Sequence, residues 1–160
     1  MRVEDAPAAG VVHVQVWRET YAADMPAAFL AALNPTVSAE KIRMRVEVDD
    51  PDARVLVAVD EDGEVLGMAT AGVTRDADAP TAWELYSINT VALVHGSGLA
   101  DRLLDAAIGS RAASLWVLGT NARAQAFYRR HGFAADGATK VHEGSGQPEV
   151  RMVRGPQPPS

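Results

Sequence analysis

The sequence contains no cysteine. A disulfide framework, a zinc site with cysteine ligands and a thiol nucleophile are therefore excluded. The histidines (His13, His95, His131 and His142) include no His-x-x-x-His pair and no carboxylate-linked spacing. The sequence therefore predicts no metal site.

Long hydrophobic runs and an excess of positive charge are also missing. No apolar run approaches the roughly 20 residues needed to cross a bilayer, and the first residues lack the apolar core of a signal peptide. These absences predict a cytoplasmic protein. The net charge of -6 argues against nucleic acid and membranes as partners, since both require a basic face. It is compatible with a cationic, amine-bearing acceptor.

Length and turn residues indicate a single α/β (α+β) domain. A chain of 160 residues can bury about 70% of its unfolded surface without a metal or a disulfide. We expect residues 1–154 to form the domain, with Ser38 as the N-cap of its third helix, and 155–160 to be a disordered tail. The expected helices are 7–22, 27–33, 38–48, 99–108 and 121–131, and the expected strands are 54–60, 64–74, 83–94, 114–118, 139–143 and 149–154.

A glycine loop, His95-Gly-Ser-Gly-Leu-Ala100, separates a strand-like run from an amphipathic helix. Glycines let the backbone approach a ligand, and the free N–H groups and dipole of a helix N-terminus favour a phosphate. The Walker ending, the third glycine of a dinucleotide fingerprint and the Gly-x-Ser-x-Gly elbow are all missing. The loop therefore indicates another kind of phosphate site, or a plain strand-to-helix turn.

A second strand and helix follow at 115–133. Asn121 begins the helix, Tyr128 lies seven residues later, and Gly132-Phe133 ends the unit. Together with His95-x-x-Gly98-x-Ala100, this unit resembles the signatures of the GCN5-related N-acetyltransferase (GNAT) family. Members of that family transfer the acetyl group of acetyl-CoA to amines.

The resemblance implies a single-domain GNAT-like fold with a mixed, mostly antiparallel twisted sheet flanked by helices. Because the chain starts almost at its first helix, we expect the family's first edge strand to be short or missing. Acetyl-CoA is the implied co-substrate. The implied binding residues are Ile88, Asn89 and Thr90 on a strand, His95, Gly96, Ser97, Gly98, Leu99, Ala100 and Asp101 in the loop, and Asn121. A basic residue is common in the family at the position of Asp101, so we expect binding to be weaker than is typical.

Tyr128 is the residue implied to protonate, or to donate a hydrogen bond to, the leaving sulfur. The alternative is a tyrosine packed at a helix–sheet junction. Asn121 is expected to face the cofactor, to cap its helix, or to do both. Trp17 and Tyr21, on the first helix, are predicted either to line the acceptor pocket or to pack in the core.

Glu84 is the predicted general base. Strand alternation would place its side chain on the same face as those of Tyr86, Ile88 and Thr90, and a carboxylate acting through water can deprotonate an amine. The alternative is a surface glutamate at the start of a strand.

The leading functional hypothesis is direct acetyl transfer from acetyl-CoA to a primary amine of a small molecule or peptide. The alternative is a catalytically weak or inactive GNAT-fold module that binds acyl-CoA and regulates or interacts with a partner. A third hypothesis is transfer of a longer acyl group. The sequence identifies no particular acceptor and leaves a homodimer open.

Overall fold

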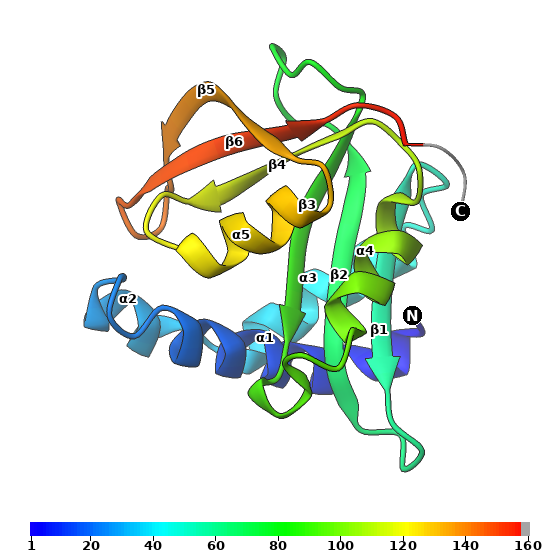
Figure 1. The fold of residues 1–160 in the computed structure, drawn as a ribbon. Coiled ribbons are helices and arrows are strands. Elements are labelled where there is room, and N and C mark those ends of the chain that lie inside the picture. Colours follow the sequence, from blue (N-terminus) through cyan, green and yellow to red (C-terminus); the bar gives the residue numbers. More distant parts are fainter. Residues whose placement is uncertain (158–160) are drawn as a thin grey trace.

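The computed structural model describes residues 1–157, which form one six-stranded sheet covered by helices (Figure 1). The strand order is β1-β2-β3-β4-β6-β5, and β3 and β4 are the one parallel pair in the described chain. The mixed, mostly antiparallel sheet predicted from the sequence is confirmed, and within residues 1–157 no strand precedes β1. The strands are β1 (Ala53–Val59), β2 (Val65–Val73), β3 (Trp83–Thr90), β4 (Ala113–Leu118), β5 (Ala134–Val141) and β6 (Pro148–Arg154).

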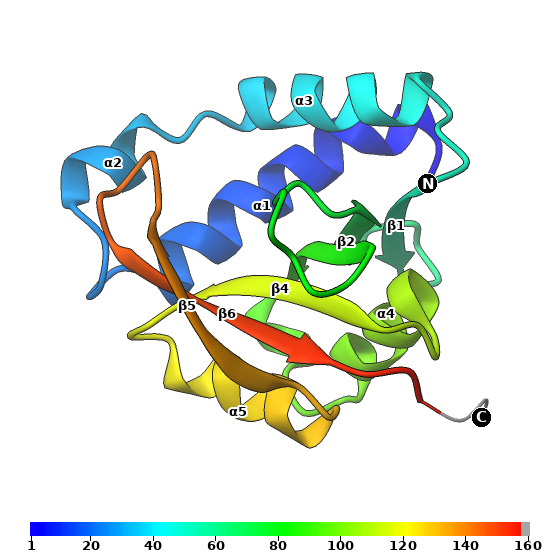
Figure 2. The ribbon, with the colours of Figure 1, turned by 90° about the horizontal axis from the view of Figure 1, so that it is seen from above.

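Helices cover both faces of the sheet. Seen from above (Figure 2), α1 and α3 lie on one side of the sheet, and α4 and α5 lie on the other. Within residues 1–157, no helix has the length and apolar character needed to cross a membrane. The helices are α1 (Ala6–Thr20), α2 (Ala27–Ala32), α3 (Pro35–Glu47), α4 (Leu99–Ile108) and α5 (Ala122–Arg130).

The main core lies between α4 and the sheet. Leu103, Leu104 and Ile108 recur at helical spacing and are at most 5% exposed. They pack against Leu85 of β3 and Met152 of β6. Burial of each such side chain contributes about 1.5–3 kcal/mol, so this apolar stripe fixes the start of α4 against the sheet.

On the opposite face, α1 and α3 touch through their backbones. A Cβ on Gly10 of α1 would lie 2.5 Å from the Pro35 carbonyl oxygen and 2.7 Å from the Ala39 nitrogen. Only glycine fits at this crossing. The contact sets the position of α1, whose C-terminal half carries Trp17 and Tyr21.

A β-bulge interrupts the ladder between β2 and β3. Thr70 pairs with Ser87, but the next residue, Ala71, pairs with Leu85, so Tyr86 has no partner in the register. Strand alternation therefore changes phase at Tyr86. Leu85 and Ile88, three residues apart, both pack into the core beneath α4.

Three predicted boundaries are wrong, and one of them is the strand predicted at 139–143, which the structure places at Ala134–Val141 as β5. The third helix begins at Pro35, not after Ser38, because Asn34 is its cap: the Asn34 side-chain oxygen accepts the N–H of Thr36 at 2.8 Å. The predicted strand 83–94 ends at Thr90 and continues as a 3₁₀ turn over Ala92–Val94.

The end of β6 leads into the predicted tail at 155–160. The Gln157 N–H donates to the Ser110 carbonyl at 2.9 Å. Residues 158–160 lie outside the described residues.

Candidate active site

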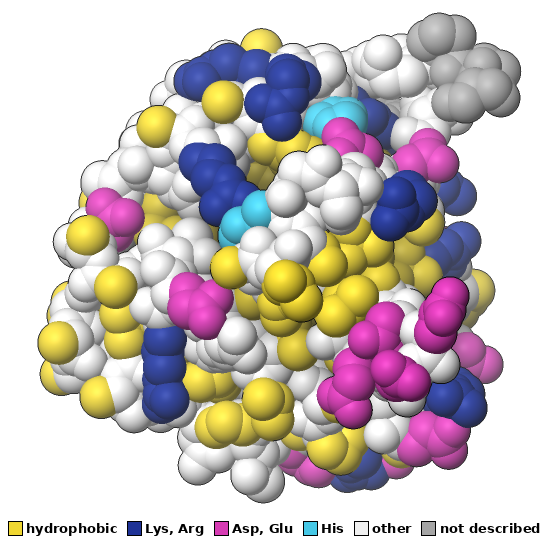
Figure 3. All heavy atoms as spheres, turned by 60° about the horizontal axis from the view of Figure 1, so that its bottom comes forward, with side chains coloured by type: hydrophobic (Ala, Val, Ile, Leu, Met, Phe, Trp, Pro, Cys, Tyr) yellow, Lys and Arg dark blue, Asp and Glu magenta, His cyan; other side chains and the backbone are white. Residues whose placement is uncertain are grey.

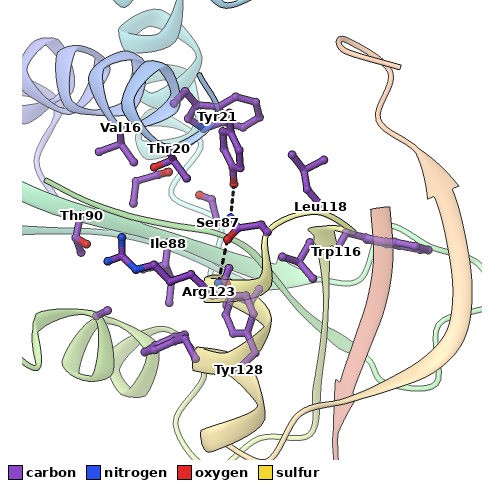
Figure 4. Close-up of a pocket in the computed structure, with 18 of the residues that line it drawn as sticks. Val16, Thr20, Tyr21, Ser87, Ile88, Thr90, Trp116, Leu118, Arg123 and Tyr128 are labelled. Atoms are coloured by element: carbon purple, nitrogen blue, oxygen red, sulfur yellow. Dashed lines mark hydrogen bonds between the residues drawn. The ribbon is translucent and has the colours of Figure 1, made fainter. Parts of the chain in front are cut away.

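The strands β3 and β4 part after a short paired segment. Their ladder has two positions, Glu84 with Ser114 and Leu85 with Leu115. Beyond it, a cavity of about 1230 Å³ lies between the strands, and α1, α5 and the glycine loop also line it. Figure 4 shows side chains from these elements converging on the cavity. In Figure 3, hydrophobic side chains are exposed in the middle of this face of the molecule, and the Lys, Arg, Asp and Glu side chains lie around them.

The structure brings together most of the residues predicted for the site. Glu84 and Ser97 do not line the cavity. The predicted residues that do line it are Trp17, Tyr21, Ile88, Asn89, Thr90, His95, Gly96, Gly98, Leu99, Ala100, Asp101, Asn121 and Tyr128.

The glycine loop presents unpaired backbone donors at the start of α4. Gly96 and Gly98 have φ angles of 82° and 78°, in the left-handed region that favours glycine. Within residues 1–157, the N–H groups of Gly98, Ala100 and Asp101 have no hydrogen-bond acceptor. These donors, together with the helix dipole, suit the phosphates of a nucleotide.

Ser97 stabilises the turn of this loop. Its hydroxyl donates to the Val94 carbonyl at 2.7 Å and accepts the Leu99 N–H at 3.3 Å. These contacts hold the Ser97 side chain within the turn and away from the cavity. A contact between Ser97 and the cofactor would therefore have to use its backbone.

Asp101 is paired by the neighbouring helix. Its Oδ1 lies 2.9 Å from Nε2 of His131, the residue that ends α5. On the other side of the loop, Nε2 of His95 lies 3.2 Å from the carbonyl oxygen of Thr90. The Asp101 carboxylate therefore has a hydrogen-bond partner at the end of α5.

Asn89 provides an unpartnered donor on the β3 side of the cavity. Its side chain is 7% exposed, and its Nδ2 has no hydrogen-bond partner within residues 1–157. Buried amide donors are normally satisfied. A ligand with carbonyl or amide oxygens, such as the pantetheine arm of coenzyme A, would supply the missing acceptor.

Tyr128 lies in an aromatic setting at the opposite side of the cavity (Figure 4). Its ring packs edge-on against Phe127 and Phe133, with centroid distances of 5.3 and 5.8 Å. Its hydroxyl makes no hydrogen bond within residues 1–157. Burial raises the pKa of this hydroxyl well above its ordinary value, so the phenol remains a neutral donor over the physiological pH range.

Asn121 caps α5 and also reaches α1. Its Oδ1 accepts the Ala124 N–H at 3.0 Å, and its Nδ2 donates to the Tyr21 hydroxyl at 3.3 Å (Figure 4). Burial raises the pKa of Tyr21, so this hydroxyl also stays neutral. Trp17 packs edge-on against Tyr21 at 5.1 Å. The aromatic side chains of α1 therefore lie against the start of α5.

Glu84 does not lie where strand alternation placed it. It is 1% exposed and does not line the cavity, and its carboxylate is bound by the backbone N–H and the guanidinium of Arg75 at 2.5–3.2 Å. The bulge at Tyr86 shifts the phase of β3, so Ile88 and Thr90 do not follow Glu84 on one face. The prediction that they share a face with Glu84 is wrong.

Sequence reasoning missed the polar residues at the far end of the cavity. β6 returns to pair with β4, which places Glu149 directly opposite Leu118. His142 Nδ1 accepts the Ser145 N–H at 3.2 Å, within the turn that joins β5 to β6. No local pattern announces these positions, because they depend on a pairing between distant segments. The missed residues at this end are Lys140, His142, Glu143 and Glu149, and Arg75 of the loop between β2 and β3 was missed as well.

The described residues form no group of three histidine, aspartate or glutamate side chains that could hold a metal ion. The donors around the cavity are backbone N–H groups, amides, hydroxyls and the cationic side chains of Arg75, Arg123, Arg130 and Lys140. This donor set suits an organic ligand with phosphate and amide groups.

Comparison with known proteins agrees with this geometry. Residues 14–133 match the model of the acetyltransferase (GNAT) family. No protein of curated function matches the sequence. The chain belongs to the acetyltransferase (GNAT) family, as the sequence motifs predicted, and members of this family use acetyl-CoA as co-substrate.

Solved structures share the whole fold. The PaiA N-acetyltransferase of Thermoplasma acidophilum, solved with coenzyme A, is 18% identical with a TM-score of 0.71, over 97% of this chain and 95% of that one. A GCN5-related N-acetyltransferase of Kribbella flavida is 25% identical with a TM-score of 0.66, over 97% and 94%. A ribosomal-protein-alanine N-acetyltransferase of Brucella melitensis is 21% identical with a TM-score of 0.69, over 96% of each chain.

Proposed function

We propose that this protein transfers the acetyl group of acetyl-CoA to a primary amine of a small molecule or peptide. The observation that carries the proposal is the single cavity in the β3–β4 fork. It is lined at one end by the unpaired N–H groups of the glycine loop and at the other by Tyr128 and α1.

Three parts of the cavity would share the binding of acetyl-CoA. The N–H groups of Gly98, Ala100 and Asp101 would hold the phosphates, and β3 with the Asn89 amide would hold the pantetheine arm. When bound, acetyl-CoA supplies an electrophilic thioester carbonyl. A backbone N–H on the free edge of β3 is the proposed donor to its oxygen.

Tyr128 is the proposed donor to the leaving sulfur. Because burial raises its pKa, full proton transfer from the phenol to a thiolate runs uphill. The role that fits is a hydrogen bond that strengthens as negative charge develops on the sulfur. The aromatic packing of the ring holds the hydroxyl in position for this.

The proton of the attacking amine needs an acceptor other than Glu84, which Arg75 holds outside the cavity. Glu149 is the proposed acceptor, directly or through water. Its side chain is 13% exposed, lines the cavity and accepts no hydrogen bond within residues 1–157.

A thermal melt with acetyl-CoA tests the proposal. Ligand at about a hundred times its dissociation constant adds ~2.7 kcal/mol to the unfolding free energy, which is at least about 5 °C for a chain of this size. We expect a shift with acetyl-CoA and none with ATP or NAD. Release of coenzyme A thiol in the presence of a panel of primary amines then tests transfer. The absence of a shift in a protein that melts cooperatively would contradict the proposal.

The second candidate is an acyl-CoA-binding module without transfer. The observation that favours it is the position of Glu84, since the base predicted from the motif is bound to Arg75. Such a module would show the thermal shift but release no thiol with any amine. The two measurements together therefore separate the candidates.

A further inference from the structure

Lysine is scarce in this chain, and one lysine lies in the cavity. Lys41 and Lys140 are the two lysines of the sequence. Lys140, on β5, lines the fork cavity, and its side chain is 39% exposed. Lys41, on the exposed surface of α3, does not line this cavity.

The contacts of Lys140 place its amine close to the fork. Its Nζ lies 4.2 Å from the centroid of the Trp116 ring and 3.9 Å from Glu149 Oε2. Trp116 directly follows Leu115, the last residue of β4 that pairs with β3, so it marks the point where the strands part. A primary amine of the chain itself therefore lies beside an indole ring and a carboxylate, and its residue lines the same cavity as Tyr128.

We propose that Lys140 is a site of self-acetylation: with acetyl-CoA bound and no other acceptor present, the protein acetylates its own Lys140 Nζ. The proposal rests on the proposed function, since it uses the same thioester and the same side chains. It also defines the acceptor subsite as one that admits a lysine side chain between Glu149 and Trp116.

The reaction balances without a further reagent. The Lys140 ammonium loses one proton, which Glu149 accepts and passes to solvent. The amine nitrogen then forms a bond to the carbonyl carbon as the carbon–sulfur bond breaks, and a second proton from nitrogen goes to the departing sulfur. The products are acetyl-lysine, the thiol of coenzyme A and one released proton.

Intact-mass analysis followed by peptide mapping tests the proposal on the wild-type chain incubated with acetyl-CoA. Exposed amines react slowly with acetyl-CoA by simple chemistry, and Lys41 and the N-terminal amine measure that background. Because the cavity holds amine and thioester together, we expect Lys140 to be acetylated at least about ten times faster than Lys41. Free coenzyme A in excess should suppress the Lys140 reaction and leave the Lys41 reaction unchanged.

Matched variants locate the reacting site. Lys140→Arg keeps the positive charge and should abolish the fast reaction, whereas Lys41→Arg should retain it. Tyr128→Phe and Glu149→Gln should each slow acetylation of Lys140 by at least about tenfold without changing that of Lys41. The thermal shift with acetyl-CoA, measured on each variant, shows that a slower reaction is not a loss of binding or folding.

Two results would overturn the inference: acetylation of Lys140 no faster than that of Lys41, or fast acetylation that persists unchanged in Tyr128→Phe and Glu149→Gln. If Lys140 reacts no faster than Lys41 while acetyl-CoA still shifts the melt and an added amine is acetylated, the inference alone fails. If acetyl-CoA gives no shift and no acetylation of any amine, the proposed function fails with it.

Discussion

The two ends of the cavity are built in different ways. The glycine-loop end comes from one stretch of chain, in which each strand is followed directly by the helix that begins at the site. The acceptor end combines α1 with the turn of the β5–β6 hairpin, segments more than a hundred residues apart, as in the packing of Trp17 against His142 with ring centroids 5.7 Å apart. Local signals are therefore enough to identify the first end. At the second end they point to Trp17 and Tyr21, and only the folded chain shows the residues of the hairpin.

This difference is visible in single residues. Asn121 and Tyr128 are two helical turns apart, so their spacing alone places both beside the same cavity. Glu149 reaches the cavity because β6 inserts between β4 and β5, and its partner Leu118 is on a different strand. A pattern along the sequence carries information over a few residues and none about such a pairing.

The largest effect is expected from Tyr128→Phe, at a residue that its spacing from Asn121 predicts. Removing the donor to the sulfur should lower kcat by about 100-fold and leave the affinity for acetyl-CoA nearly unchanged. Steady-state kinetics with an accepted amine, beside a melt with acetyl-CoA, measures both quantities. Tyr21→Phe is the matched control and should have the smaller effect on kcat. An unchanged kcat in Tyr128→Phe would remove this residue from the mechanism.

Gly10→Ala perturbs the acceptor end from outside the cavity. Helix propensity alone would make alanine about 1 kcal/mol more stable than glycine in α1. The added Cβ would instead clash with the backbone of Pro35 and Ala39, so we expect a loss of about 3 kcal/mol in unfolding free energy. Denaturant titration measures it, with Gly155→Ala as control, because a Cβ there has nothing within 4 Å. Greater stability of Gly10→Ala would contradict the close contact.

Glu84→Gln separates a structural from a catalytic role for the predicted base. The buried carboxylate accepts charge-assisted bonds from Arg75, so its replacement should lower the unfolding free energy by about 2 kcal/mol. At a temperature where the variant is folded, kcat should stay within about twofold of wild type. A flattened dependence of kcat on pH in this variant would return Glu84 to the mechanism.

Asp101→Asn, in the glycine-loop end, is expected to have the smallest effect of these substitutions. Removing a negative charge near the phosphates should tighten acetyl-CoA binding, but the exposed pairing with His131 limits the gain to about threefold. Titration calorimetry measures the change, and Asp105→Asn, farther along the same helix, is the control. An equal gain in both variants would show that net charge, not position, is responsible.

The sequence predicted the fold and the family, and most of the predicted site residues line the cavity, but the prediction failed at particular points. Glu84 was misplaced because one extra residue at Tyr86 reverses strand alternation. Ser38 was mistaken for a cap because Asn34 and Pro35 begin the helix one turn earlier. Lys140 and Glu149 carried no local signal at all, since a charged residue on a strand near a hairpin is ordinary by itself.

The two-position ladder between β3 and β4 also has a mechanical consequence. It divides the sheet into two three-stranded halves, β1–β2–β3 and β4–β6–β5. The halves are joined only by the pairs of Glu84 with Ser114 and Leu85 with Leu115 within the described residues. Because few backbone hydrogen bonds hold β3 to β4, we expect the sheet to bend most easily between these two strands. We therefore expect a ligand that contacts both halves of the sheet in the fork to restrict bending at this point.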